Sequence, residues 1–440
     1  MGEVRGPTSP GNVLPRAIDI LSQGRETGKH KISCNLLADK TYARFRRPVT
    51  AISTSKISPA RLVALEVLTA VAGGKYASDT LLERARLLDA RDAGLASQIV
   101  FGCLRYQAQL DHLIFLCSGR KTADLDGAVV LALRAAIFQM RYLDRIPPHA
   151  AVHESVEFVK QRKRAAAGFA NAVLRKVNRA PVEWPNAAVE LSCPSWLLDR
   201  WTAHFGSSQA RAIARAALEE PIPYVRVPPG SAAPVDVSIE PTSVEGCFRV
   251  LSPLPPGMRL HDIGSQSILP ILDLQAGHTF LDLCAAPGNK TLQALETPLE
   301  LAIACDISRK RILELPPVCP RVVLDATRPL PFSRPFDRIF IDAPCSGTGT
   351  LARNPEIKWR VQPREFARFR EQQLLMLSQA VQLLAPGGKL LYATCSLEPE
   401  ENEEVVRRAL CVRPDLRCER EVWRLPGRDE GDGFYAAVLC

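Results

Sequence analysis

The stretch TFLDLCAAPGNKT, residues 279–291, decides the fold of this chain, because it joins an apolar strand to a tight loop and a following helix. Small residues in the loop allow the backbone to approach a ligand closely, and the start of the helix favours an anionic group. The loop is not the phosphate-binding pattern G-x-x-x-x-G-K-[ST], because the first glycine is missing and the spacing is short. It therefore predicts a site for a carboxylate rather than for a triphosphate.

Four successive apolar runs in this part of the chain have an acidic residue near their ends: Asp282, Asp306, Asp325 and Asp342. An acid at the end of the second strand can hold ribose hydroxyls. Aspartates also cap turns at strand ends, so any one of them alone is ambiguous. Together they indicate a cofactor that carries a nucleoside and a carboxylate tail, and S-adenosylmethionine fits this description.

Two cysteines each follow an apolar β-like run, Cys345 after residues 338–341 and Cys395 after residues 390–393. Parallel strands would deliver both to the same edge of a sheet, where open α/β folds bind their ligands. A thiolate is the strongest common side-chain nucleophile. Two thiols beside a nucleotide-type loop suggest covalent attack on an electrophilic ring, although the residues alone do not decide which sulfur attacks.

The composition is that of an ordinary globular protein, with 440 residues, 46% of them hydrophobic and 23% charged, enough for two or three domains. The net charge of +9 favours an acidic partner, with nucleic acid slightly ahead of a generally basic proteome. No apolar run approaches the roughly 18 residues that span a bilayer, so we expect no membrane segment. None of the 13 cysteines is spaced as C-x-x-C, which favours free thiols in a reducing cytoplasm and no metal site.

Composition and periodicity divide the chain into four parts. We expect residues 1–56 to be an irregular, disordered extension, and both a basic tail and an upstream start codon remain open as explanations. Residues 57–180 show helical periodicity and predict an all-α bundle, with a helix start at Ser58 and Pro59. Residues 181–264 predict linking helices and a small α+β region. Residues 265–440 alternate β-like and helical runs, which predicts a Rossmann-like α/β domain with a doubly wound parallel sheet.

The helical periods of the all-α part fall around 79–90, 93–116, 128–142, 150–162 and 166–178. Basic residues gather toward the end of this part, and a solvated helix face and an RNA-contacting patch are about equally good explanations. These basic residues are Arg141, Arg145, Lys160, Arg162, Lys163, Arg164, Arg175, Lys176 and Arg179.

The chain resembles the Sun/Fmu family of bacterial 16S ribosomal RNA cytosine-5 methyltransferases. The resemblance is carried by the motifs LDLCAAPG (281–288), DAPCSGTG (342–349), RNPEIKW (353–359) and YATCS (392–396). The segments FGCLRY (101–106) and ANAVLR (170–175) look like the family's N-terminal RNA-binding domain of the NusB type. Two residues depart from the family pattern. Asn289 stands where a second glycine is usual, and asparagine tolerates positive φ, while Gly264 stands where a less flexible residue is common.

The resemblance implies the site residues. It assigns the attacking thiolate to Cys395, release of the product to Cys345, and support of the cytosine ring edge to Asp342. We expect Lys290 either to lower the pKa of a neighbouring thiol or to bind a carboxylate or a phosphate. The alternative is a lysine at the start of a helix that faces solvent. The residues expected to hold S-adenosylmethionine are Cys284, Ala285, Ala286, Pro287, Gly288, Asn289, Lys290, Asp306, Asp325 and Asp342.

The same resemblance implies a partner and a substrate. We expect 16S ribosomal RNA, with the target cytosine single-stranded or flipped, and a monomeric enzyme. Arg353, Lys358, Trp359 and Arg360 are candidates for contact with RNA phosphates or a base, and Trp359 is equally well explained as core.

Other interpretations compete with this one. Methylation of an exocyclic amine typically uses Asp/Asn-Pro-Pro-Tyr, which residues 342–345 do not fit. DNA cytosine methylation would leave Cys395 unexplained. A non-catalytic RNA-binding assembly factor would transfer no methyl group.

Overall fold

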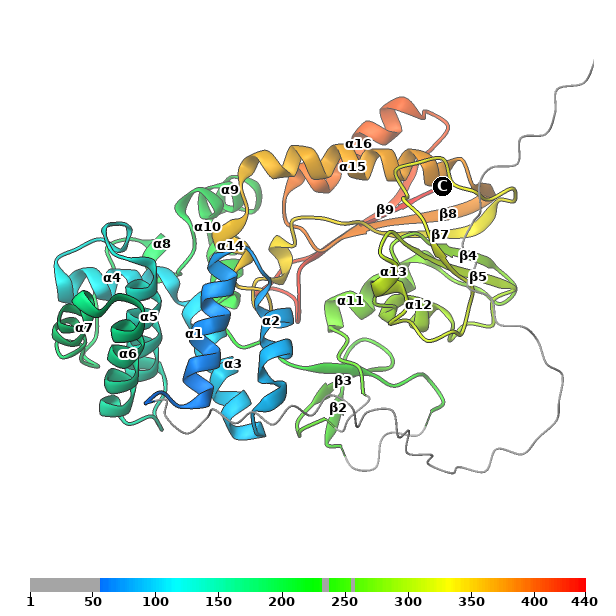
Figure 1. Ribbon diagram of the computed structural model, residues 1–440. Coiled ribbons are helices and arrows are strands. Elements are labelled where there is room, and N and C mark those ends of the chain that lie inside the picture. The colour runs from blue at the N-terminus through cyan, green and yellow to red at the C-terminus, as the bar shows by residue number, and fades with distance from the viewer. Residues whose placement is uncertain (1–55, 232–236, 255–257) are drawn as a thin grey trace, which may run out of the picture.

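The computed structural model describes residues 56–231, 237–254 and 258–440 of the chain. In Figure 1 a bundle of helices lies at one end, a large sheet covered by helices lies at the other, and a small sheet lies between and below them. The predicted fold class is confirmed: an all-α part and a small α+β region precede a Rossmann-like domain. The extension expected for residues 1–56 lies, apart from Lys56, outside the described residues.

The helical bundle packs around α5, whose residues Val129, Leu133 and Ile137 are buried against its neighbours. Its helices are α1 (Pro59–Ala72), α2 (Ala77–Arg84), α3 (Ala90–Arg105), α4 (Gln107–Ser118), α5 (Gly127–Tyr142), α6 (Pro148–Lys163) and α7 (Ala167–Leu174). Helix α1 begins with Pro59 directly after Ser58, as the sequence predicts. Ser58 makes no cap hydrogen bond within α1, and its hydroxyl donates to Glu154 of α6 instead.

The prediction of one helical segment over residues 93–116 is wrong, because the chain forms two helices, α3 and α4, that meet at Tyr106. Tyr106 leaves the helical conformation, with φ −97° and ψ 17°. Its ring stacks on Tyr142 with the ring centroids 4.5 Å apart. The bend follows from packing against α5, which apolar periodicity alone does not record.

The linking region contains helices α8 (Ala187–Glu190), α9 (Ser195–Phe205) and α10 (Ser207–Ala216) and strands β1 (Tyr224–Arg226), β2 (Ile239–Pro241) and β3 (Cys247–Val250). The three strands form an antiparallel sheet in the order β1-β3-β2. This agrees with the short strands and turns predicted for this part of the chain.

The large sheet has the strand order β6-β5-β4-β7-β8-β10-β9. Its strands are β4 (Thr279–Asp282), β5 (Leu301–Asp306), β6 (Arg321–Val323), β7 (Phe336–Asp342), β8 (Leu384–Thr394), β9 (Cys418–Arg424) and β10 (Phe434–Leu439). Strands β6, β5, β4, β7 and β8 are parallel, as predicted, but β10 pairs antiparallel with both β8 and β9. The turn from β9 to β10 is too short for the crossover that a parallel pair requires.

Helices cover both faces of this sheet (Figure 1). Alternate residues of β7 separate the two cores: Ile339 and Ile341 pack on the side of α15 (Pro363–Val381) and α16 (Glu403–Val412), whereas Phe340 packs on the side of α11 (Ile263–Ile268) and α12 (Asn289–Ala294). The remaining helices are α13 (Arg309–Ile312) and α14 (Ile357–Arg360). The strands therefore end at an edge that is left open between the helical layers.

The segment that follows Cys345 joins the sheet domain to the helical bundle. Lys358 is 1% exposed, and its Nζ donates to the carbonyl of Arg105 at 2.8 Å. Trp359 donates from Nε1 to the carbonyl of Leu104 at 2.7 Å, and Arg105 in return donates to the carbonyl of Ala352 at 2.9 Å. The expectation that Lys358 contacts RNA is therefore wrong, because this side chain is buried against the backbone of α3. Trp359 is half-buried, and its bound N–H favours the alternative that it belongs to the core.

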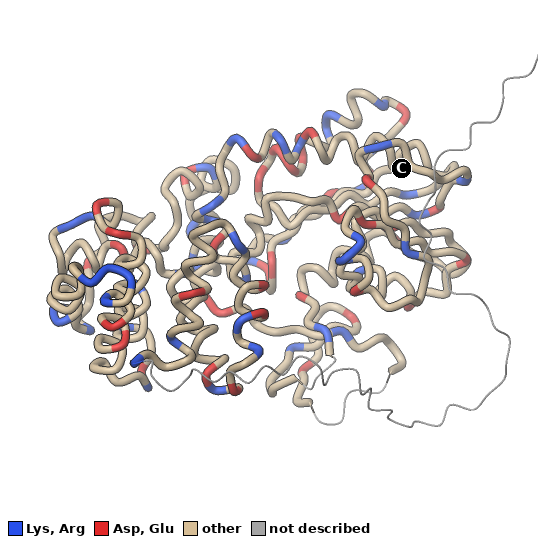
Figure 2. Tube along the Cα trace, viewed as in Figure 1, with Lys and Arg blue, Asp and Glu red and all other residues tan. Residues whose placement is uncertain are grey.

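Two of the basic residues that gather at the end of the all-α part serve the fold. Arg179 donates to the carbonyls of Met140 and Leu143, and Arg141 donates to that of Ala180, which fastens the end of the bundle to α5. Figure 2 shows Lys and Arg interspersed with Asp and Glu over the whole trace. Within the described residues no helix is both long and apolar enough to cross a membrane.

Candidate active site

A buried aspartate, Asp282, fixes the loop after β4. Asp282 is 1% exposed, and its carboxylate accepts hydrogen bonds from the backbone N–H of Cys284 at 3.2 Å and the hydroxyl of Thr291 at 2.7 Å. Burial raises the pKa of Asp282 to about 7, with the negative charge of Asp342 acting in the same direction. Asp282 thus closes the strand-loop-helix turn rather than facing solvent.

Gly288 carries the left-handed conformation of this loop, with φ 109°. A Cβ atom there would lie 2.5 Å from Leu315, so the position admits no side chain without a rearrangement. Asn289 is the first residue of α12 and is not among the non-glycine residues of the described chain with positive φ. The interpretation that Asn289 replaces a glycine for its positive φ is therefore wrong, and its Nδ2 donates to the carbonyl of Leu260 at 3.0 Å instead.

The remaining loop residues have backbone partners on neighbouring elements. Ala285 donates to the carbonyl of Cys305, and the N–H of Ala286 donates to Asp306 Oδ2 at 3.2 Å. The carbonyl of Pro287 accepts from Arg259 at 3.1 Å. Burial of its sulfur raises the pKa of Cys284 well above the ordinary value, which favours the neutral thiol, and the residue as a whole is half-buried beside the loop.

The acids predicted at the strand ends are at different depths. Asp306 ends β5 and is 5% exposed, and its other carboxylate oxygen accepts from the N–H of Ser308 at 2.8 Å. Asp325 follows β6 and accepts from the backbone and hydroxyl of Thr327, which lowers its pKa. Asp342 ends β7, so the open edge of the sheet receives an acid from each of three strands.

The two predicted cysteines meet. Cys345 Sγ and Cys395 Sγ lie 3.4 Å apart, at the ends of the paired strands β7 and β8. Cys395 is fixed through its carbonyl, which accepts from the N–H of Gly349 at 2.9 Å. The hydrogen bond to Cys395, together with burial, raises the pKa of Cys345 well above the ordinary value for a thiol. The two sulfurs are thus in hydrogen-bond contact, and either thiol can be the donor.

Lys290 points into the same edge. Its Nζ lies 2.8 Å from Asp342 Oδ2 and 5.2 Å from the centroid of the Phe434 ring. Burial acts to lower the pKa of Lys290, but the charge of Asp342 and the hydrogen bond to it outweigh this effect, and the pKa is raised. The alternative of a helix-start lysine in solvent is wrong, since the Lys290 side chain is 12% exposed. The Lys290 ammonium is thus a positive charge held at the edge of the sheet that carries Asp342 and the two cysteines.

Sequence reasoning missed Glu401, which lies behind both cysteines. Glu401 is 0% exposed, and its carboxylate accepts from the N–H of Ser346 at 2.8 Å and from the hydroxyl of Ser396 at 2.8 Å. Burial raises its pKa to about 7, opposed by these hydrogen bonds. The run of acids at 398–404 is typical of a solvated helix start. The only signal for Glu401 in the sequence is its position five residues after Ser396.

Ile307 is an exposed apolar residue at the sheet edge that sequence reasoning did not single out. It follows Asp306 directly and is 68% exposed, an apolar side chain left uncovered where β5 ends. An apolar residue placed immediately after a strand-end acid is the signal in the sequence. Such a side chain offers a flat ring a surface to lie against.

The segment around Gly264, residues 261–266, is fixed to the loop before β10. Arg353 binds the carboxylates of Asp432, at 2.9 Å, and Asp262. Gly264 has no room for a side chain, because a Cβ atom would lie 2.4 Å from the carbonyl oxygen of Asp432. The departure at Gly264 is therefore explained by close backbone contact, and Arg353 holds these loops together.

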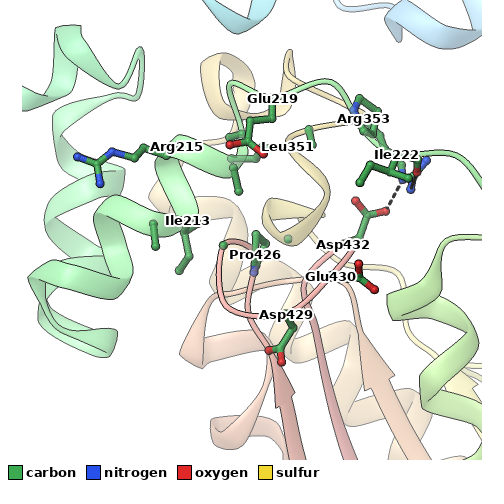
Figure 3. Close-up of a pocket in the computed structure, with 18 of the residues that line it drawn as sticks. Ile213, Arg215, Glu219, Ile222, Leu351, Arg353, Pro426, Asp429, Glu430 and Asp432 are labelled. Carbon is green, nitrogen blue, oxygen red and sulfur yellow. Dashed lines mark hydrogen bonds and ion pairs between the residues drawn. The ribbon is translucent and has the colours of Figure 1, made fainter. Parts of the chain in front are cut away.

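A cavity of about 550 Å³ opens beside these residues, between α10, the turn after Cys345 and the loop before β10. Figure 3 shows Asp432 reaching toward Arg353 at its wall, with Glu219, Asp429 and Glu430 around it. Cys345 and Cys395 are not among the lining residues, so this cavity lies next to the cysteine edge and is separate from it.

Comparison with known proteins agrees with this geometry. Residues 269–440 match the family described as 16S rRNA methyltransferase RsmB/F, and residues 58–179 match the NusB family. The chain is 31% identical over 419 residues to ribosomal RNA small subunit methyltransferase B of Cronobacter sakazakii, covering 86% of this chain and 97% of that relative. Its identity to the protein of the same name from Citrobacter koseri is 32% over 419 residues, with the same coverage.

The solved structure described as PH0851 superposes with a TM-score of 0.73 at 22% identity, covering 87% of this chain and 99% of that chain. This structural likeness shows the fold alone. The match to each of the two sequence relatives extends over 97% of that relative. The chain belongs to the RsmB/F family of 16S ribosomal RNA methyltransferases and carries an N-terminal NusB domain.

Proposed function

We propose that this methyltransferase modifies carbon 5 of a cytosine in 16S ribosomal RNA through a covalent bond between Cys395 and the ring. The observation that supports this most is the pair of sulfurs 3.4 Å apart at an edge that also holds the Lys290–Asp342 ion pair. Methylation of an exocyclic amine has no use for two thiols in contact. The chemistry of carbon 5 does, because that carbon is a poor nucleophile until a thiolate adds to carbon 6.

The residues at the sheet edge fit S-adenosylmethionine, the methyl donor of these enzymes. Asp306 uses two acceptor positions on backbone N–H groups and keeps others for ribose hydroxyls. The exposed Ile307 suits a ring face, and the small residues at 284–286 leave the backbone approachable. When bound, S-adenosylmethionine supplies an electrophilic methyl group on a positively charged sulfur.

The side chains then divide the work. The Cys395 thiolate forms a bond to carbon 6, which moves electron density to carbon 5. Lys290 and Asp342 are a charged pair in fixed positions, suited to support the charge that develops on the ring. Once carbon 5 has taken the methyl group, it loses its proton to solvent, and the electron pair of that carbon–hydrogen bond restores the double bond between carbons 5 and 6. The bond between Cys395 and carbon 6 breaks in the same step, and its electron pair leaves on the sulfur. The Cys345 thiol, 3.4 Å from that sulfur, can donate a hydrogen bond to it and so assists release.

Cysteine variants test this assignment with unmodified 16S ribosomal RNA and tritiated S-adenosylmethionine. Cys395→Ala is expected to abolish methyl transfer while the cofactor still binds. Cys345→Ala is expected to accumulate a protein–RNA adduct, seen as a retarded band on a denaturing gel. Cys411→Ala, at an exposed cysteine, is the matched control and should behave as the wild type. Substantial turnover by Cys395→Ala would overturn the nucleophile assignment, and mapping the label in the RNA identifies the cytosine.

A further inference from the structure

Glu401 lies at the contact between the two cysteine loops, and its carboxylate binds the residues that follow the cysteines rather than the sulfurs themselves. One carboxylate oxygen accepts from the backbone N–H of Ser346, the residue after Cys345. The other accepts from the hydroxyls of both Ser346 and Ser396, the residue after Cys395. The two hydroxyl oxygens are themselves 3.1 Å apart. One buried carboxylate thus bridges the ends of β7 and β8.

The turn that carries Glu401 is itself fixed to the same strands. The carbonyl of Glu401 accepts from the hydroxyl of Tyr392 in β8 at 2.6 Å. The next residue, Asn402, donates to the carbonyl of Ser396 at 2.9 Å. Gln373 of α15 donates to the carbonyl of Pro344 at 2.9 Å and reaches Glu401 Oε2 at 3.4 Å. The carboxylate is therefore held from its own turn, from the sheet and from a covering helix.

The chemistry of this group points to positioning rather than to stability. Burying a carboxylate without a cation is costly, and among the ion pairs of the described residues none includes Glu401. A hydrophobic residue would join two loops at a lower cost. A carboxylate, in contrast, accepts several hydrogen bonds in fixed directions and sets the spacing of the groups that donate them.

We propose that Glu401 is a positioning residue for both sulfurs, whose carboxylate ties the Cys345 loop to the Cys395 loop and keeps the two thiols in contact. This inference rests on the proposed function for its kinetic consequence, but its geometric part can be measured without any RNA. Loss of the bridge frees each loop to shift, and a displacement of about 1 Å of a reacting group is enough to lower a rate about 100-fold.

The first test measures the rate at which Cys345 and Cys395 form a disulfide, which depends on how closely the two thiols are held. Diamide oxidises a pair of contacting thiols: the thiols lose two electrons and two protons, the sulfur–sulfur bond forms, and the diazene is reduced to the hydrazine. Peptide mapping after trypsin follows the bond between residues 339–353 and 390–407, which each contain one cysteine. Glu401→Ala is expected to form this disulfide about 10-fold more slowly than the wild type.

The matched control is Glu400→Gln. Glu400 lies on the same turn, but its carboxylate pairs with Arg200 at 2.7 Å on the other side. This variant should form the disulfide at the wild-type rate. Glu401→Gln should fall between the wild type and Glu401→Ala, since its amide oxygen can still accept from Ser346 and its NH₂ can donate to a hydroxyl. If Glu401→Ala does not fold, Glu401→Gln and Ser396→Ala carry the same comparison.

The second test is kinetic. Glu401→Ala is expected to lower kcat for RNA methylation about 100-fold while the KM values stay near those of the wild type, with partial rescue in Glu401→Gln. Equal disulfide rates in Glu401→Ala and Glu400→Gln would overturn the proposal. If the wild type transferred no methyl group to RNA but the disulfide rates differed as expected, the proposed function would fall and the positioning role would stand.

Discussion

Replacing Lys358 by methionine is expected to stabilise the protein at neutral pH and to lose that advantage in alkali. The Lys358 amine is buried between the two domains, and burial lowers its pKa from 10.5 to about 7, with Arg105 adding to the effect and Cys193 opposing it. One pH unit corresponds to about 1.4 kcal/mol, so the difference between these values corresponds to about 5 kcal/mol of unfavourable burial of the charged form.

The substitution also removes a favourable contact. Lys358→Met would leave the carbonyl of Arg105 without the hydrogen bond that Lys358 Nζ donates at 2.8 Å, a loss of about 1–3 kcal/mol. The net expected gain for Lys358→Met is therefore about 2–4 kcal/mol at a pH of about 6.5. The folded protein releases the proton at a lower pH than the unfolded chain does, so between pH 7 and 10.5 the unfolded state binds more protons. Wild-type stability consequently rises with pH in that window.

The measurement is guanidinium unfolding of wild type and variant at several pH values, followed by tryptophan fluorescence. Trp359 reports directly, because Lys358 Nζ lies 5.2 Å from its ring centroid. The difference in free energy of unfolding should shrink by about 4 kcal/mol from about pH 6.5 to about pH 10 and vanish or change sign there. Lys310→Met, at an exposed lysine of α13, is the control and should show a difference that does not change with pH. A constant difference for Lys358→Met would refute the reasoning.

Three further substitutions test the site and its supports. Gly264→Ala should destabilise the protein by about 1–3 kcal/mol in thermal unfolding, since the added methyl group meets the Asp432 carbonyl; an unchanged Tm would contradict the packing described. Lys290→Met should reduce single-turnover methyl transfer about 100-fold or more, and combining it with Asp342→Asn should cost little beyond that; fully additive losses would argue against a working pair. Trp359→Phe should lose about 1 kcal/mol of stability with RNA affinity unchanged, because its N–H binds Leu104; a large loss of RNA binding would restore the RNA-contact interpretation.

The meeting of the two cysteines was predictable because it follows from topology. Each cysteine comes directly after a run that forms a strand, and neighbouring parallel strands end at one edge. The same argument places Asp306 and Asp342, since a strand-end acid needs only the strand to be recognised. Local pattern was sufficient for this part of the site.

What could not be predicted depends on burial between segments distant in sequence. Lys358 and Trp359 have the composition of an RNA-binding surface, yet their partners, Arg105 and Leu104, lie far earlier in the chain, in α3. Glu401 stands in an acidic run that is typical of a solvated helix start, and its role appears only once β7 and β8 are side by side. Tyr106 interrupts a continuous apolar period because of a ring in another helix.

The hydrogen bonds between α3 and the segment after Cys345 have a consequence for how a substrate is chosen. Arg105 both donates to Ala352 and accepts from Lys358, and Glu356 accepts from the N–H of Ala77 at the start of α2. A hinge cannot open there without breaking all three hydrogen bonds. A nucleic acid bound on the bundle would therefore lie at a constant distance from Cys395 Sγ, and only a base at that distance from the bound segment would reach this sulfur.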